Sequence, residues 1–454
     1  MENRGPIRRR LVGLPALRVG GLIGLALAVR MLAWAVTDAT GPAGDEGDWL
    51  LRAARVARGA PWPDDGGRAP GLIFFYAAAF KIAGVHIDVA KGANVLVSAL
   101  TVWPVFEIGR RLGGVRTGVA AALAFGLYPT LIAFSHFLWP APLYIFLVST
   151  GVAALLVAVE REGRQRALWL GGAGVSLGLS ALVKESGLGF PVVAALWVGW
   201  RCRDDLFSGW AAGLWVGAVA TLVVVPWVIF LQRPDQPFAL VTRTGYMNLY
   251  VGNHPHGHGV GMKEYPNLGA TPQQSQEVAR DRAFRWIRSR GLLWPLEKVV
   301  QELPRFFTPT SFAIRRLLAE PDAPGGWRYR LAPPWLDQPW VRGLGVVIVV
   351  ASYWAALAMG TIGLILARRR EITALFGVFI ATQILPSMVM FSMSRFRLAT
   401  MTFLLIGTGL FCVRGSADWR AASRARRGFA VGVSLILLGL SALDASSVLE
   451  STGR

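Results

Sequence analysis

Three acidic side chains stand close together early in the chain, in the stretch GPAGDEGDWL (residues 41–50). Asp45, Glu46 and Asp48 follow a strongly apolar segment, although the whole chain has only 27 acidic residues among 454. A carboxylate can act as a general base that accepts a proton from a hydroxyl group. The same residues also favour the first turn of a helix, and Asp48 is the best placed to cap a helix expected over residues 49–58. Both interpretations of the cluster stay open at this point.

Several cationic residues stand at the ends of apolar segments elsewhere in the chain. Arg68 follows the acidic cluster, Lys184 follows an apolar block, and Arg395 and Arg397 precede another one. Charged groups at membrane depth are costly unless they are paired or hydrated, so they are functional candidates. Carboxylates that face several cations indicate a site for an anionic substrate and a reaction that needs a base. The alternative is that Lys184 snorkels to the membrane surface and that the two late arginines contact only lipid headgroups.

The composition indicates a membrane protein. Of the 454 residues, 54% are hydrophobic and 16% are charged, against about 25% charged residues in soluble domains. The apolar residues form blocks of roughly 17–25 residues, the length that crosses a bilayer as a helix. We therefore predict an all-α polytopic membrane protein with about eleven transmembrane helices. The predicted spans are residues 15–37, 93–110, 117–135, 142–159, 167–183, 187–200, 208–231, 343–367, 373–392, 397–413 and 429–447.

Basic clusters in every second short connection predict the orientation of the chain. Arginines gather within residues 8–10, 110–116, 161–166, 201–203, 368–370 and 414–427. Because cytoplasmic loops retain Lys and Arg, this pattern places the N-terminus in the cytoplasm and the acidic cluster outside a cell inner or plasma membrane. The same rule explains the net charge of +20, so we expect membrane lipids and no nucleic acid as partners.

The first outer loop, residues 38–92, contains a further apolar stretch, APGLIFFYAAAFKIAG (69–84). A span at this point would reverse the charge pattern of most later loops. We therefore predict an interfacial or re-entrant helix there, although a span is the alternative.

A second large outer loop is predicted over residues 232–342, with amphipathic helices around 273–290 and 295–306. The predicted organisation has three parts, which are an N-terminal transmembrane module (1–231) with the loop 38–92, the large loop (232–342), and C-terminal transmembrane helices (343–454).

A series of motifs along residues 15–413 resembles one family of membrane enzymes. The motifs are GDEGDWLLRAARVARG with RAPGLIFFYAAAFKIAG, then NVLVSALTVWPVFEIGRRLGG, GLYPTLIAFSHFLWPAPLYIF, PWVIF with NLYVGNHPHGHG, and SRFRLATMTFLLIGTG. In order and spacing they resemble the GT-C glycosyltransferases, in the branch of the protein O-mannosyltransferases, the aminoarabinose transferase of lipid A and the RgtA/B/C/D-like enzymes. The resemblance implies a GT-C fold, with interfacial helices in the first outer loop and one large outer loop.

The resemblance also implies a transferase that moves a monosaccharide from a polyprenyl-phosphate donor to a glycan, lipid or protein acceptor on the outer face. Asp45 matches the first-loop acid of the family and is the expected base, and Glu46 is expected to orient the acceptor or to share that role. The expected ligands of the donor phosphate are Arg68, Lys184, Arg395 and Arg397, since transfer needs cations to stabilise the leaving group. The expected substrate-binding residues are His136, Tyr246, Asn248 and Asn253.

The chain departs from this family at one position. Relatives often carry a second acid near the stretch WPAPLY, where this chain has Ala141. Either His136 substitutes for that acid or the second acidic role is absent. The departure weakens a mechanism that uses two carboxylates or a bridging metal ion.

No cofactor is certain from the sequence, and a divalent metal stays open as an alternative. His254, His256 and His258 alternate in HPHGHG and can share an ion if that segment is extended, although the intervening Gly and Pro residues favour a loop. The alternative function is a transporter or flippase for a lipid-linked sugar, which predicts charges at mid-bilayer and inverted repeats. A membrane scaffold without catalysis is a third alternative.

Overall fold

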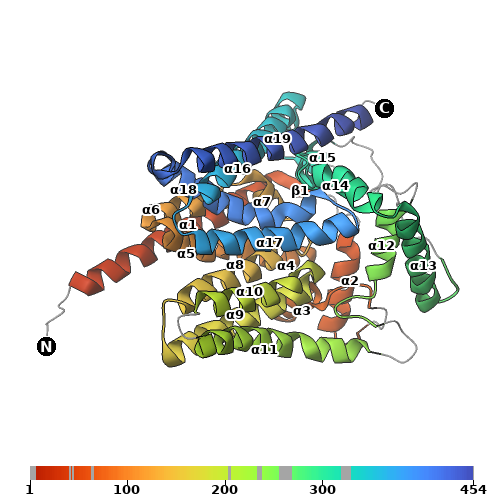
Figure 1. Cartoon of the computed structure of the whole chain (residues 1–454). Helices are drawn as coiled ribbons and strands as arrows, with labels where there is room; N and C mark the ends of the chain where they lie inside the picture. Colours follow the sequence, from red (N-terminus) through yellow and green to blue (C-terminus); the bar gives the residue numbers. More distant parts are fainter. Residues whose placement is uncertain are drawn as a thin grey trace.

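The computed structural model describes residues 7–39, 42, 45–62, 66–202, 206–232, 238–254, 268–318 and 329–452. Long helices run side by side through one bundle (Figure 1). Within these ranges, nine helical segments are long and apolar enough to cross a membrane, which confirms the predicted polytopic all-α class. They are α1 (Ile7–Val36), α4 (Ile87–Leu100) with α5 (Val102–Gly113), α8 (Ala141–Ala158), α9 (Gly163–Val183), α11 (Leu206–Leu231), α16 (Pro339–Leu366), α17 (Arg370–Val389), η3 (Ser394–Arg397) with α18 (Leu398–Ala421), and α19 (Arg424–Thr452).

Two of the eleven predicted spans correspond to shorter helices. The span predicted over 117–135 is broken into α6 (Val115–Gly126) and α7 (Pro129–Phe134), because a proline disfavours helical geometry in the residue before it. The span predicted over 187–200 is α10 (Gly189–Arg201), a helix of 13 residues that follows the short turn η1 (Glu185–Gly187). The total of eleven therefore stays a prediction.

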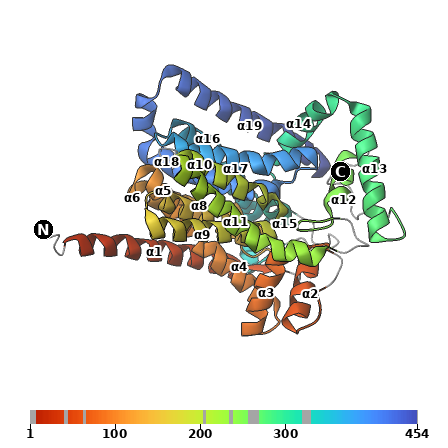
Figure 2. The same cartoon turned by 60° about the horizontal axis from the view of Figure 1, so that its bottom comes forward.

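The first outer loop forms two helices that project together from the bundle, α2 (Asp45–Ala57) and α3 (Pro70–Ala83) (Figure 2). The predicted start of the first of these helices at residue 49 is wrong, because it begins four residues earlier, at Asp45. Its first turn holds all three acids, which the positive end of the helix dipole favours. With 14 residues, α3 is about 21 Å long and is shorter than a hydrocarbon core of about 30 Å. Its length agrees with an interfacial or re-entrant helix.

In its described residues, the large loop contains four α-helices, one strand and the short 3₁₀ helix η2 before α16. Its helices α13 and α14 confirm the two amphipathic helices that the sequence predicts. The strand β2 pairs antiparallel with β1 directly after α1, with Thr37 opposite Leu331, and so ties the loop back to the first span. The elements are α12 (Gly245–Asn253), α13 (Pro272–Arg290), α14 (Leu293–Phe306), α15 (Phe312–Leu318), β1 (Thr37–Ala39), β2 (Tyr329–Leu331) and η2 (Pro334–Asp337).

Glycines let α16 and α18 approach closely. A Cβ atom at Gly360 would lie 2.3 Å from the Leu404 carbonyl oxygen, and one at Gly407 would lie 2.4 Å from the Gly360 carbonyl oxygen. Small residues at helix crossings allow this kind of packing in membranes, where dispersion contacts replace the hydrophobic effect. The contact fixes the N-terminal half of α18, which directly follows η3, against α16.

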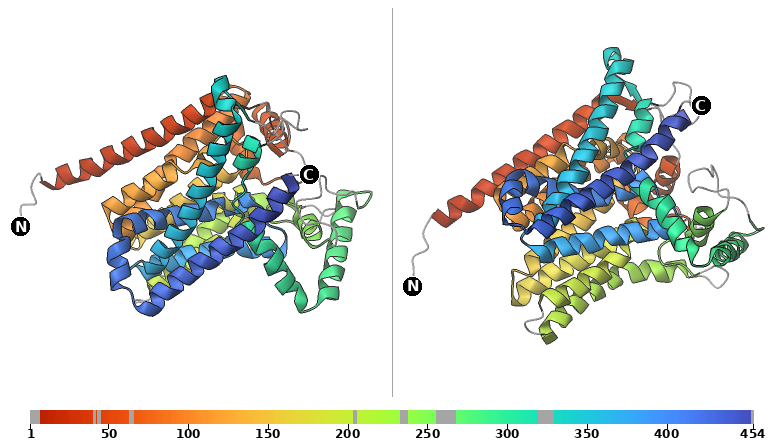
Figure 3. Two further views of the ribbon diagram at one scale, coloured as in Figure 1. Left: turned by 90° about the horizontal axis from the view of Figure 1, so that it is seen from above. Right: turned by 45° about the horizontal axis from the view of Figure 1, so that its top comes forward.

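The two ends of the bundle differ. Helices α2, α12 and α13 lie at one end, which we call the α2 end (Figures 1 and 3). The connections α5–α6, α8–α9, α16–α17 and α18–α19, which have arginines within them or in the adjoining helix ends, lie at the other, which we call the arginine-rich end. Helix α1 begins at the arginine-rich end and α19 finishes at the α2 end (Figure 3).

Candidate active site

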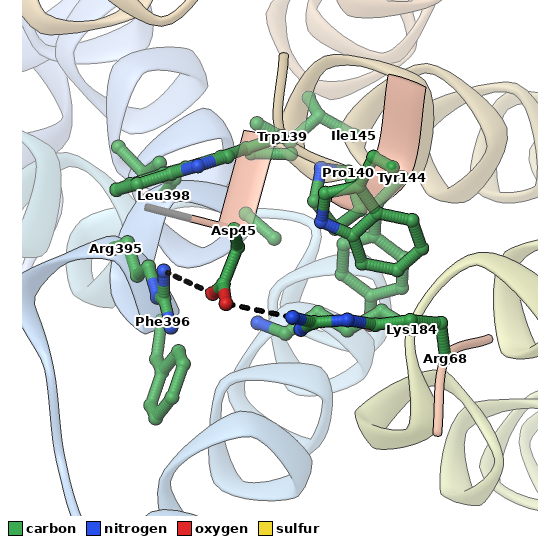
Figure 4. A pocket seen from close by; sticks show the side chains of 13 residues that line it. Asp45, Arg68, Trp139, Pro140, Tyr144, Ile145, Lys184, Arg395, Phe396 and Leu398 are labelled. Carbon is green, nitrogen blue, oxygen red and sulfur yellow. Dashed lines mark hydrogen bonds and ion pairs between the residues drawn. The ribbon is translucent and has the colours of Figure 1, made fainter. Parts of the chain in front are cut away.

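A cavity of about 140 Å³ opens at the α2 end of the bundle (Figure 4). Its walls come from five regions of the sequence, which are the first two turns of α2, the segment before α3, the start of α8 with the turn before it, the junction of α9 with η1, and η3 with the start of α18. A water molecule occupies about 30 Å³, so the cavity has room for several waters or for part of a larger polar ligand. The lining residues are Asp45, Trp49, Arg68, Trp139, Pro140, Ala141, Tyr144, Ile145, Lys184, Arg395, Phe396, Leu398 and Ala399.

Asp45 stands between two arginines in this cavity (Figure 4). Its Oδ1 accepts a hydrogen bond of 2.7 Å from Nη2 of Arg68, and its Oδ2 lies 3.6 Å from Nη1 of Arg395. Burial alone would raise the pKa of the Asp45 carboxyl, but the charges and hydrogen bonds of Arg68 and Arg395 outweigh it, and the pKa is lowered. Asp45 is therefore ionised near neutral pH as long as both guanidinium groups face it.

Arg68 is held in place by a second carboxylate of the same helix. Its Nε donates a 2.7 Å hydrogen bond to Oδ2 of Asp48, and Nε of Arg52 donates one of 2.8 Å to the other oxygen of Asp48. The Arg68 guanidinium also lies 5.2 Å from the ring centre of Trp49. Asp48 thus orients Arg68 toward Asp45, which replaces the helix-capping role predicted for it.

Lys184 enters the cavity because α9 ends immediately before it. The residue adopts an extended conformation, and its Nζ lies 5.5 Å from the ring centre of Tyr144 and 4.9 Å from that of Phe396. Among the described residues, no carboxylate lies within ion-pair distance of this ammonium group. Burial, and to a smaller extent the charge of Arg395, lower the pKa of Lys184 to about 7. Near pH 7 the group is therefore only partly protonated, and no carboxylate neutralises its charged form.

The structure separates the two arginines of the R-F-R motif. Arg395 lines the cavity, with its guanidinium 4.7 Å from the ring centre of Trp139. Arg397 is buried on another side, donates to the Phe306 carbonyl oxygen at 3.2 Å, and lies over the ring of Tyr353. Residues two apart on a 3₁₀ turn point in different directions, because that helix has three residues per turn. Only Arg395 is in a position to contact a ligand of this cavity.

Glu46 is likewise turned away from its neighbour Asp45. It is buried, and its Oε1 accepts hydrogen bonds of 3.1 Å from the Leu138 backbone N–H and from Nη2 of Arg316. Successive residues of an α-helix are about 100° apart, so adjacent acids cannot share one cavity wall. In this structure Glu46 joins α2 to α15 and to the turn before α8.

The remaining predicted substrate ligands do not line the cavity. His136 is buried, with ring nitrogens 3.1 Å from the carbonyl oxygens of Arg30 and Ala133. Burial is the largest influence on this imidazole and lowers its pKa. His136 therefore helps to fix the turn before α8 to α1.

Tyr246, Asn248 and Asn253 are on α12. Tyr246 is partly exposed and Asn248 lies 3.4 Å from the Thr244 hydroxyl. Asn253 is buried, donates to the Val389 carbonyl oxygen at 3.0 Å, and accepts a 2.7 Å hydrogen bond from Nε1 of Trp294. The structure thus assigns Asn253 a packing role between α12, α14 and the end of α17.

Sequence reasoning missed the aromatic walls of the cavity and the surroundings of Glu185. Trp49, Trp139 and Phe396 each lie under a cation, and only their positions beside the predicted charged residues gave a signal. Burial raises the pKa of the Glu185 carboxyl to about 7, and that carboxyl accepts a hydrogen bond from the Thr242 hydroxyl. Glu185 therefore connects η1 to the segment before α12.

The acids at this site do not fit a divalent metal ion. Asp45 and Asp48 are both occupied by guanidinium groups, and within the described ranges no three His, Cys, Asp or Glu side chains are grouped closely enough to hold a metal. Divalent cations such as Ca²⁺ and Mg²⁺ take about six oxygen ligands and lose much of their affinity beside fixed cations. His256 and His258 lie outside the described residues, and the ring of His254 packs against Tyr250.

Comparisons with known proteins address the fold. Residues 67–230 match the family model described as dolichyl-phosphate-mannose-protein mannosyltransferase. The structure of the oligosaccharyltransferase AglB from Archaeoglobus fulgidus, in complex with an inhibitory peptide and a dolichol-phosphate, aligns with a TM-score of 0.54 at 14% identity, over 96% of this chain and 55% of that one. The chain has the GT-C glycosyltransferase fold. The fold that the resemblance in the sequence implies is thereby confirmed.

Two other solved structures align with lower TM-scores. The apo form of the same oligosaccharyltransferase aligns with a TM-score of 0.52 at 14% identity, over 95% of this chain and 55% of that one. ArnT from Cupriavidus metallidurans, bound to undecaprenyl phosphate, aligns with a TM-score of 0.43 at 15% identity, over 88% and 78% of the two chains. No curated protein sequence matches the chain. The chain spans about half the length of the archaeal enzyme whose fold it shares.

Proposed function

We propose that this protein transfers a monosaccharide from a polyprenyl-phosphate-linked donor to an acceptor hydroxyl at the α2 end of the bundle. The observation that carries the proposal is the placement of Asp45 between Arg68 and Arg395, in a cavity that also holds the unneutralised Lys184. A family model for dolichyl-phosphate-mannose-dependent transferases covers part of the chain, and a neighbour of the same fold binds dolichol-phosphate. Both support a lipid-linked phosphate donor.

In the proposed reaction, the donor phosphate binds to Lys184 and Arg395 beneath the aromatic walls. The acceptor oxygen attacks the anomeric carbon while the bond from that carbon to the phosphate oxygen breaks, and the polyprenyl phosphate leaves with the electron pair. The acceptor proton passes to Asp45. Cations that face the leaving phosphate stabilise the charge that develops on it, and Arg offers planar, bidentate contacts to phosphate.

The lowered pKa of Asp45 is consistent with this role. In the free protein, Arg68 and Arg395 stabilise the carboxylate and make it a weak base. A bound phosphate competes for the Arg395 guanidinium and adds a negative charge nearby, and both effects raise the pKa of Asp45. The carboxylate thus becomes a better proton acceptor when the donor is in place.

The other predicted residues receive supporting roles in this proposal. Glu46, His136 and Arg397 position the turn before α8 and the turn η3, which carry Trp139 and Arg395. The partly exposed residues Tyr246 and Asn248 on α12 remain candidates for contact with a large acceptor.

The proposed orientation follows the arginine clusters. It places the arginine-rich end in the cytoplasm and the α2 end outside a cell inner or plasma membrane. We also propose the three-part organisation at 1–231, 232–342 and 343–454, in which the first and last parts form the bundle.

The test is sugar transfer by the purified full chain in liposomes, from a panel of labelled polyprenyl-phosphate monosaccharides to extracted cell-envelope lipids. We expect Asp45→Asn to lower the rate 100-fold or more, since general base catalysis contributes roughly 10²–10⁴-fold. Asp88→Asn is the control, because Asp88 is an exposed acid at the start of α4 and does not line the cavity, and it should keep the wild-type rate. Equal rates for Asp45→Asn and wild type would refute the role of Asp45. Movement of donor across the bilayer without transfer would instead identify a flippase.

A further inference from the structure

A second and larger cavity lies away from the candidate active site. It has a volume of about 1020 Å³ and lies between α17 and α19, with α16 and α18 as its floor. Figure 3 shows α17 and α19 on the same side of the bundle. Leu303 of α14 and Phe307, the residue directly after that helix, close it at the α2 end. We call this cavity the α17–α19 groove.

The groove is lined by one stripe of each helix. Helix α17 contributes residues from Arg370 to Ile384, and α19 contributes residues from Arg426 to Leu440, mostly at spacings of three or four. These spacings keep the side chains on one helix face. At 1.5 Å per residue each stripe is about 21 Å long, which exceeds one leaflet of about 15 Å in a 30 Å hydrocarbon core.

A lipid chain is the natural occupant of such a groove. Its walls are mostly apolar, and Phe429 and Ile436 on its rim are more than half exposed. Apolar cavities do not hold water, and an empty groove would leave its wall atoms without dispersion contacts. The groove faces the surface that the transmembrane helices present to the bilayer, so acyl chains have access to it.

Cations gather at the arginine-rich end of the same groove. Arg370 is exposed, and no acidic partner within ion-pair distance of it occurs in the described part of the chain. Arg426 is fixed by hydrogen bonds of 2.8 Å and 2.6 Å to the carbonyl oxygens of Ile365 and Ala367, at the end of α16. The nearby acid, Asp418, is already paired. This end of the groove therefore carries uncompensated positive charge.

We propose that the α17–α19 groove binds one anionic phospholipid, with its phosphate at Arg370 and Arg426 and an acyl chain along the apolar stripes. Basic pockets between transmembrane helices select anionic headgroups in this way. The site is distinct from the donor site, because its cations lie at the opposite end of the bundle from Asp45. It is a lipid site that the glycosyltransferase proposal does not require.

The experiment measures lipid binding to the purified full chain by native mass spectrometry. The probes are palmitoyl-oleoyl phosphatidylglycerol, which is anionic, and the phosphatidylcholine with the same chains. Arg370→Gln should weaken phosphatidylglycerol binding about fivefold, the usual effect of one arginine near an anionic lipid headgroup. Gly377→Phe should abolish binding, because Gly377 lines the groove and a side chain there enters open space. Ala374→Leu is a second, smaller groove-filling variant if the phenylalanine variant does not fold.

Matched controls separate the groove from general effects. Arg164→Gln removes an exposed arginine from the same end of the bundle, and Gly439→Phe adds a ring to α19 outside the groove lining. Both should bind phosphatidylglycerol as wild type does. Equal binding of the two lipids, or unchanged binding in Gly377→Phe and Ala374→Leu, would overturn the proposal. Displacement of phosphatidylglycerol by polyprenyl phosphate, at one molecule for one, would overturn it in favour of a donor-tail site.

Discussion

The unneutralised Lys184 makes donor binding depend on pH in a direction that the structure fixes. Burial lowers the pKa of this ammonium group to about 7 in the free protein. A bound phosphate favours the charged form and raises that pKa, so the donor and the proton assist each other in binding. Affinity should then be greatest below pH 7 and fall as the pH rises through the pKa of the free protein. The donor is a phosphodiester and keeps a constant charge over this range.

The size of the effect follows from a single titrating group. If the protonated form of Lys184 binds the donor, the apparent dissociation constant scales as 1 + 10^(pH − pKa), which predicts a rise of about 90-fold between pH 6 and pH 9. The assay is equilibrium binding of a labelled polyprenyl-phosphate sugar to the protein in nanodiscs. Wild type should show the full rise, provided that the pKa of the bound state lies above 9.

Substitutions at Lys184 and Glu185 test which of these two residues causes the pH dependence of donor binding. Lys184→Arg keeps its charge across this range and should bind tightly with a flat profile, whereas Lys184→Met should bind about tenfold or more weakly, also with a flat profile. Glu185 is the necessary control, because burial raises the pKa of its carboxyl to about 7 as well. Glu185→Gln should keep the wild-type slope. A pH slope that persists in Lys184→Arg, or that disappears in Glu185→Gln, would refute the assignment to Lys184.

Two further predictions concern stability and packing. Glu46→Gln removes the carboxylate that pairs with the buried Arg316, and breaking a buried ion pair of this kind typically costs about 3–5 kcal/mol. The thermal unfolding midpoint in detergent should therefore fall markedly, while transfer per folded molecule stays within tenfold of wild type. A loss of transfer at unchanged stability would instead show that Glu46 takes part in the chemistry. Gly407→Leu forces a side chain against the Gly360 carbonyl oxygen across the α16–α18 crossing. This variant should lose the monodisperse peak in size-exclusion chromatography. The control Gly432→Leu should keep that peak, because a Cβ at Gly432 meets nothing within 4 Å.

The sequence predicted the helical elements better than the site. The apolar blocks and the amphipathic pattern of the large loop are local properties, so nine spans and the helices α13 and α14 follow from them. The break before Pro129 was missed because the apolar composition continues across it. The early start of α2 was missed because the cap was assigned to Asp48, so only the residues after it were expected in the helix.

Whether a predicted site residue lines the cavity depends on the direction in which its side chain points, which the sequence does not show. Asp45, Arg68, Lys184 and Arg395 all line the cavity, although they come from four separate segments. Glu46 does not, even though it is adjacent to Asp45, because the helical rotation turns it toward Arg316. A sequence that is rich in polar residues at one membrane face does not state which of them share a cavity.

The sequence by itself determined the membrane class, most of the spans, the charge asymmetry of the connections and the set of polar residues available at one end. These features follow from the cost of placing charges and unpaired backbone groups in hydrocarbon, a cost that acts on each segment separately. Only the tertiary structure decided that Asp45 meets Arg395, which lies 350 residues further along the chain. The contact depends on how close α18 lies to the other helices, and that distance is set by packing across the bundle, which no local pattern encodes.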